Sequence, residues 1–170
     1  YNRSDGHRPD MEFGQAGGYA KLGYEISQAW NVRADVNVTH FNASQPGTVT
    51  NPMADADQRI TRGMTSLSVE NNYGRTSGAL SLFYNWGRHR INDGYTVDPN
   101  DTNNPKDYRF NSRDDMMGVS WYQSARLFRG NRLTVGADYY RFGGEAWNRY
   151  VGGDRKGERS DIADKSQDEV

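Results

Sequence analysis

Six stretches of this chain alternate apolar and polar residues one for one, and the connections between them alternate between short turns and long polar loops. Successive side chains of a β-strand point to opposite faces, so each stretch would have one apolar and one polar face. Repeated six times with connectors of alternating length, the pattern is typical of the wall of an outer-membrane β-barrel. Lipid then covers one face of the sheet and a wet lumen covers the other.

The apolar positions of the six predicted strands recur at every second residue. By strand, they are Ala20, Leu22, Tyr24 and Ile26; Val32, Ala34, Val36 and Val38; Thr65, Leu67 and Val69; Leu80, Leu82, Tyr84 and Trp86; Met117, Val119, Trp121, Ala125 and Leu127; and Leu133, Val135, Ala137 and Tyr139. Short turns are expected at 28–31, 74–78 and 129–131, and long loops at 42–60 and 91–114. We therefore predict an all-β fold, an antiparallel meander of about six strands that forms part of a transmembrane β-barrel wall with long extracellular loops.

Composition is compatible with this fold. Only 34% of the 170 residues are apolar and the mean hydropathy is −1.01, but a barrel strand needs apolar side chains only at every second position. No apolar run reaches the roughly 18 residues of a transmembrane helix. The net charge of −1 gives no support to nucleic-acid binding, and the absence of cysteine rules out disulfides and thiolate metal sites.

Residues 1–170 are expected to belong to a single β-barrel domain that is truncated at both ends. The chain begins at Tyr1 without an initiator methionine or a secretory signal. Residues 152–170 are rich in glycine and charge and are predicted to be a further extracellular loop. Six strands are also too few to close a barrel, since the smallest closed barrels have eight.

A soluble β-sandwich is the alternative architecture. Its two sheets would bury these same apolar faces against each other. Such a domain would be a soluble or peripheral binding module, for example for carbohydrate.

Several segments resemble the barrel of TonB-dependent outer-membrane receptors of the Bacteroidetes type. They are RSDGHR at 3–8, GGYAKLGY at 17–24, DVNVTHFN at 35–42 and the stretch 149–170. The resemblance implies a location in the cell outer membrane and a role in the active uptake of a scarce nutrient of the iron–siderophore, haem or cobalamin class. It also implies three partners: outer-membrane lipid, the rest of the barrel with its plug domain, and the TonB complex.

The predicted cargo contacts lie near the long loops. Loop aromatics can stack on a flat ligand, although they can also simply anchor loops. The predicted set is Tyr95, Tyr108, Phe110 and Trp147, with His89 as the best-placed imidazole. By strand parity His89 points to the lumen side and His40 outward. The three histidines could ligate haem iron or another metal cargo, but no pair has the spacing of a metal motif.

Two other sets of polar residues can be explained without a bound ligand. In one loop, Asp98, Asn100 and Asp101 could offer oxygen ligands to calcium, but the EF-hand pattern fails and a solvated loop is the alternative. The predicted lumen-facing charges are expected to form cross-strand ion pairs that fix the register. They are Arg33, Asp35, Glu70, Arg126 and Asp138.

The sequence predicts no enzyme and no resident metal or cofactor. The chain has no Gly-x-Ser-x-Gly motif, no cysteine nucleophile and no phosphate-binding glycine loop. Adjacent carboxylates such as Asp114 and Asp115 would face opposite sides of a strand. An outer-membrane protease or lipase is the enzymatic alternative.

Overall fold

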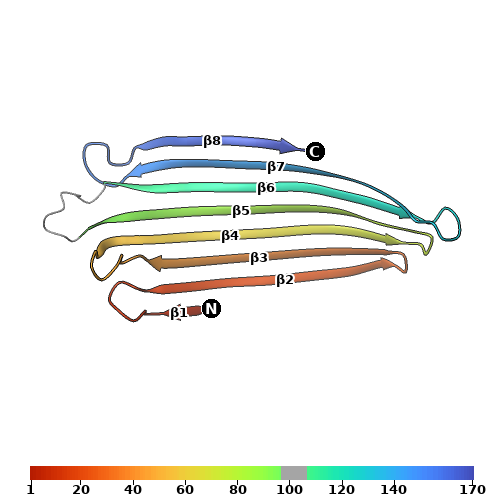
Figure 1. Ribbon diagram of the computed structural model, residues 1–170, viewed down its shortest axis with the longest axis horizontal. Helices are drawn as coiled ribbons and strands as arrows, with labels where there is room; N and C mark the ends of the chain where they lie inside the picture. Colours follow the sequence, from red (N-terminus) through yellow and green to blue (C-terminus); the bar gives the residue numbers. More distant parts are fainter. Residues whose placement is uncertain (97–106) are drawn as a thin grey trace.

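The computed structural model describes residues 1–96 and 107–170, which form one antiparallel sheet of eight strands paired in sequence order (Figure 1). The long connections gather at one end of the sheet and the short turns at the other. We call these the loop end and the turn end. The strands are β1 (Asn2–Ser4), β2 (Phe13–Ser27), β3 (Trp30–Ser44), β4 (Met53–Asn72), β5 (Thr76–Thr96), β6 (Tyr108–Ala125), β7 (Leu133–Tyr150) and β8 (Arg159–Glu169).

The predicted all-β meander is confirmed, and the six predicted strands correspond to β2–β7. The prediction that 152–170 is a loop is wrong, because β8 pairs with β7 over most of that segment. The backbone ladder needs no apolar side chain, so a strand as polar as β8 can add to an existing edge. With β8 and the short β1, the six predicted strands form a sheet of eight. No helix in the described part of the chain is long and apolar enough to cross a membrane.

The long loops are shorter than predicted. β3 continues to Ser44 and β4 begins at Met53, so most of the predicted loop 42–60 is strand. β4 and β5 reach 20 and 21 residues, about twice the 9–11 residues that a tilted strand needs to cross a membrane. In these loop-end extensions the strand face that is apolar in the middle of the sheet carries polar side chains. The extensions therefore do not continue the apolar–polar alternation from which the strands were predicted.

Cross-strand register joins the six predicted apolar sets into one continuous face. A single row of directly opposed residues runs across six strands, through Leu22, Ala34, Leu67, Leu82, Val119 and Tyr139. We call this face 1. Face 2 carries the polar partners, for example Lys21, Asp35 and Ser66. All strands belong to one sheet, so the two packed sheets of the alternative sandwich are not formed.

Face 1 is apolar but uncovered. No hydrophobic side chain among the described residues is buried, and Leu22 and Leu82 are 75% and 42% exposed. On the opposite face of β5, Ser81, Phe83 and Asn85 are half-buried. The polar face is therefore the more covered one, the reverse of a sheet that packs its apolar side in a water-soluble core.

Face 1 is apolar only over part of the length of each strand. We call this region of face 1 the apolar band. In β3 the band runs from Trp30 to Val38 and in β5 from Gly78 to Trp86, about nine residues, close to the 9–11 that span a bilayer. At its turn end the Trp30 indole N–H donates to the Tyr73 hydroxyl. At its loop end Trp86 lies against Gly63.

On face 2, an aromatic pair covers Gly118. The rings of Phe83 and Tyr140, from the strands on either side of β6, have centroids 5.8 Å apart. A Cβ at Gly118 would lie only 2.5 Å from the Phe83 ring and 2.7 Å from Tyr140. The glycine is thus required by close approach of the two rings.

We predict that Gly118→Ala destabilises the sheet by about 1–3 kcal/mol, because the added methyl group overpacks a filled position. Gly23→Ala is the matched control, since a Cβ there meets nothing within 4 Å, and it should change the stability by no more than about 0.5 kcal/mol. Urea unfolding of the full-length gene product in detergent micelles measures both. Equal costs would show that the rings do not depend on Gly118.

Candidate functional site

At the loop end, face 2 changes from polar to apolar. Beyond the apolar band the apolar residues of the long strands move to the opposite parity, so that they lie on face 2. Phe41 opposes Ile60, and Ile91 opposes Phe110. We define the loop-end apolar patch as Phe13, Phe41, Ile60, Ile91 and Phe110, all of which are half-buried.

Aromatic contacts extend this surface. The rings of Phe13 and Phe41 are 6.2 Å apart between centroids. Tyr108 and Tyr150 pair at 5.8 Å further toward the loops, on the same face as Phe110. The guanidinium of Arg155 lies 4.1 Å from the Tyr150 ring centroid and donates to its hydroxyl at 2.7 Å. The surface therefore offers apolar ring faces with polar groups at its margin, which suits a flat, partly apolar ligand.

A polar cluster around His89 lies beside the patch. Arg62 pairs with Asp114 at 2.7 Å and donates to His89 Nε2 at 3.2 Å, and His89 Nδ1 lies 3.1 Å from the Ser112 hydroxyl. Gly87 makes room for this arrangement, because a Cβ there would lie 2.6 Å from an Asp114 oxygen. Four side chains from β4, β5 and β6 are thus held together on face 2.

The hydrogen bonds of His89 define what its ring can do. An arginine can only donate, so His89 Nε2 accepts and a neutral ring carries its proton on Nδ1. The ring is only 18% exposed. With Nε2 engaged by Arg62, the lone pair that a metal would need is already used in this arrangement.

The other histidines are dispersed. His40 lies on face 1 and its Nδ1 is 2.7 Å from the Thr61 hydroxyl, so the predicted opposite parity of His40 and His89 is confirmed. His7 lies in the exposed β1–β2 connection. Among the residues that the structure describes, no three His, Asp or Glu side chains are grouped as a metal site.

The predicted cargo contacts are divided between the two faces. Tyr108, Phe110 and His89 share face 2, whereas Trp147 lies on face 1 opposite Asn111, under the guanidinium of Arg159 at 4.2 Å. The backbone of Tyr95 pairs with Ala54 at the end of β5, and its side chain lies outside the described residues. The suggested calcium ligands Asp98, Asn100 and Asp101 also lie outside them.

The predicted lumen-facing charges interact only in part. Arg33 and Glu70 form a cross-strand ion pair at 3.1 Å, and Asp35 accepts a hydrogen bond from Ser66 at 2.5 Å. In the described part of the chain, Arg126 and Asp138 form no ion pair with this set.

Sequence reasoning missed four members of the patch: Phe13, Phe41, Ile60 and Ile91. They fall in segments that were assigned to loops or left outside the strands. Each has the parity of the polar face when the alternation of its neighbouring strand is continued. Continuing the alternation beyond the predicted strands, forward from Val38 and Trp86 and backward from Ala20 and Thr65, would have placed these four residues on face 2.

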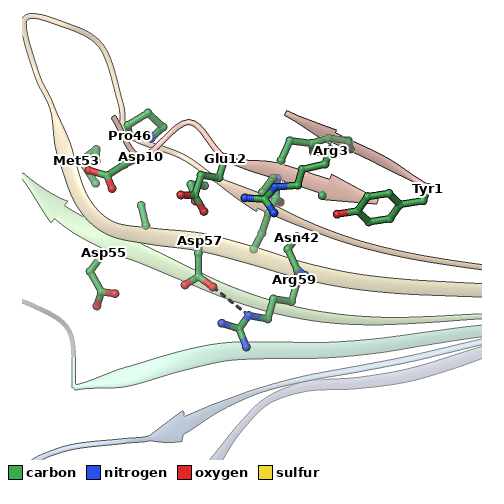
Figure 2. A pocket seen from close by; sticks show the side chains of 16 residues that line it. Tyr1, Arg3, Asp10, Glu12, Asn42, Pro46, Met53, Asp55, Asp57 and Arg59 are labelled. Carbon is green, nitrogen blue, oxygen red and sulfur yellow. Dashed lines mark ion pairs between the residues drawn. The ribbon is translucent and has the colours of Figure 1, made fainter. Parts of the chain in front are cut away.

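A groove of about 650 Å³ lies on the loop-end corner nearest β1 (Figure 2). Four carboxylates and two guanidiniums line it, and one pair, Asp57 and Arg59, is in contact at 3.4 Å. The acidic residues are Asp10, Glu12, Asp55 and Asp57. We call this the acidic groove.

The comparisons with known proteins return nothing. No protein-family model matches the chain, and no curated protein or solved structure matches it.

We predict that Gly87→Ala and Asp114→Ala are coupled. In the wild-type background the added methyl group pushes Asp114 away from Arg62, whereas in the Asp114→Ala background the obstructing oxygen is gone. The double variant should therefore lose about 0.5–1 kcal/mol less stability than the sum of the losses of the two single variants. Urea unfolding of the four proteins of this cycle measures the coupling. Strict additivity would mean that Gly87 does not serve the ion pair.

Proposed function

We propose that the chain forms part of the barrel wall of a TonB-dependent outer-membrane receptor. The observation that carries the proposal is the single sheet whose uncovered face is apolar over a membrane-wide band, while its other face is polar and more covered. Lipid is the solvent that fits such a face, because a β-barrel wall alternates apolar-out and polar-in along each strand.

Three further features support the membrane assignment. The aromatic residues Trp30 and Tyr73 meet at the turn-end margin of the band and Trp86 lies at the loop-end margin, where outer-membrane barrels have aromatic girdles. Connections are short at one end of the sheet and long at the other. The two sheet edges, β1 and β8, are not paired to each other, so further strands are needed to satisfy them in a bilayer.

The family proposal rests on the resemblance of the segments described above. In such a receptor face 2 lines the barrel interior, and the loop end opens to the cell exterior. The loop-end apolar patch then lies where cargo enters. A cargo of the iron–siderophore, haem or cobalamin class, which presents flat conjugated surface, fits half-buried aromatic rings better than a small hydrophilic solute does. The role is transport, with no reaction at the site.

The barrel assignment predicts different costs for arginine on the two faces. Val36→Arg and Leu82→Arg on face 1 should each destabilise the protein by about 2–4 kcal/mol, because the charge would sit in hydrocarbon. Ser66→Arg and Ser120→Arg on face 2 should cost less than about 1 kcal/mol. Equilibrium unfolding of the full-length gene product from phosphatidylcholine vesicles measures these values, and equal costs on both faces would refute the assignment.

The cargo assignment predicts a difference between aromatic residues on opposite faces. The double variant Tyr108→Ala/Phe110→Ala should weaken cargo binding roughly tenfold, since ring contacts are lost. Trp147→Ala, on face 1, is the control and should leave the affinity unchanged. Tryptophan-quenching titrations with haemin, a ferric catecholate siderophore and cyanocobalamin give the affinities. If Trp147→Ala lowered the affinity and the double variant did not, the cargo would bind elsewhere than at Tyr108 and Phe110.

A further inference from the structure

Face 1 becomes strongly basic immediately beyond the apolar band at the loop end. A shallow groove of about 600 Å³ lies there across β4–β8. Glu145 is its one acidic lining residue among those that the structure describes. Five arginines line the groove: Arg59, Arg88, Arg90, Arg113 and Arg159. We call it the arginine groove.

The register places like charges directly opposite each other. Arg59 on β4 opposes Arg90 on β5, and Arg88 on β5 opposes Arg113 on β6. Directly opposed residues of an antiparallel pair have Cβ atoms about 4.5–5.5 Å apart, so like charges at these positions destabilise the sheet. Two adjacent arginine pairs are a costly arrangement unless an anion lies between them.

The carboxylates of the chain neutralise only the flanks of the groove. Glu145 pairs with Arg113 at 2.8 Å and with Arg159 at 3.2 Å, and Arg59 pairs with Asp57 at 3.4 Å. Arg88 and Arg90 have no carboxylate within ion-pair distance in the described part of the chain. Arg88 instead lies over the Trp86 ring, 6.0 Å from its centroid.

The remaining polar groups on this side leave the centre positive. The side-chain hydrogen bond to Asp161 raises the pKa of Arg159, and an arginine guanidinium is always charged in proteins. His40 and Thr61 also line the groove, and the Nδ1 of His40 lies 2.7 Å from the Thr61 hydroxyl. The acidic groove lies nearer β1 on the same face, so an anion is directed away from it toward β5 and β6.

We propose that the arginine groove binds the phosphate group of a phosphorylated membrane lipid in the leaflet at the loop end. The inference rests on the proposed function, because it requires that face 1 meets lipid. In a bilayer the headgroup phosphates lie just outside the hydrocarbon. Trp86 is the last residue of the apolar band in β5, and Arg88, two residues further along, is the next residue on the same face. Arginine forks bind phosphate oxygens in bidentate geometry.

The continuity of the two surfaces favours a lipid over a free phosphate. Below a phosphate bound between Arg88 and Arg90, the same strand presents Trp86 and then the exposed side chains of Tyr84 and Leu82. The acyl chains of a lipid would cover those side chains. An inorganic phosphate would gain nothing from them and would remain exposed to water.

The test uses the full-length gene product in a mild detergent, titrated with lipid A or with inorganic phosphate while native mass spectrometry reports the bound fraction. The variant is Arg88→Gln/Arg90→Gln. The control is Arg129→Gln/Arg132→Gln, which removes the same charge from exposed positions of the β6–β7 turn. The wild type and the control should bind lipid A, and the groove variant should bind it about tenfold or more weakly, a loss expected when charge-assisted hydrogen bonds are removed.

Each result decides the proposal. Equal lipid A binding by the groove variant and the wild type overturns it. Binding of inorganic phosphate as tight as that of lipid A, lost in the same variant, overturns the lipid as occupant and leaves a free anion site. Protease protection in phosphatidylcholine vesicles is measured in parallel. Failure of the wild type to insert there refutes the proposed function and this inference with it, whereas insertion without selective lipid A binding refutes this inference alone.

Discussion

The uncovered apolar face is the constraint on which the rest of this structure depends. Backbone hydrogen bonds hold eight strands in one sheet, but the net contribution of such bonds to stability is small because water competes for them. Burial of apolar side chains supplies the main driving force in folded proteins, and no part of the described chain covers Leu22, Val36 or Leu82. The missing burial has to come from outside the chain, and lipid supplies it in the proposed barrel.

Packing within the chain is concentrated on the polar face, where glycines make room for larger neighbours. Gly118 accommodates the rings of Phe83 and Tyr140, and Gly87 accommodates the pair of Arg62 and Asp114. These contacts couple three adjacent strands at a time. They hold His89 against Arg62 beside the loop-end apolar patch, so the candidate site is positioned by rigid strands rather than by loops.

Alternation predicted β2–β7 and the two faces of the sheet because the apolar band follows the period of two without long interruptions. It failed outside the band for a physical reason: there the apolar residues change parity or disappear, as at Phe41 and throughout β8. The partners of His89 could not be predicted either. Arg62 and Asp114 are 52 positions apart, and only the register across β4, β5 and β6 brings them to one place.

The change of polarity between the two faces also bears on how the strands find their alignment. Simple alternation rejects a slip of one residue, which turns every side chain to the wrong face, but it tolerates a slip of two. Here the polarity of both faces reverses at the same level in β3 and β5, the two strands that flank β4, because Val38 and Trp86 both oppose Gly63. A two-residue slip of β5 against β4 would bring Arg88 opposite Gly63, which is level with Val38 at the margin of the apolar band. The reversal therefore acts as a positional mark along the strand axis, and it specifies an alignment that a uniform alternating pattern would leave degenerate.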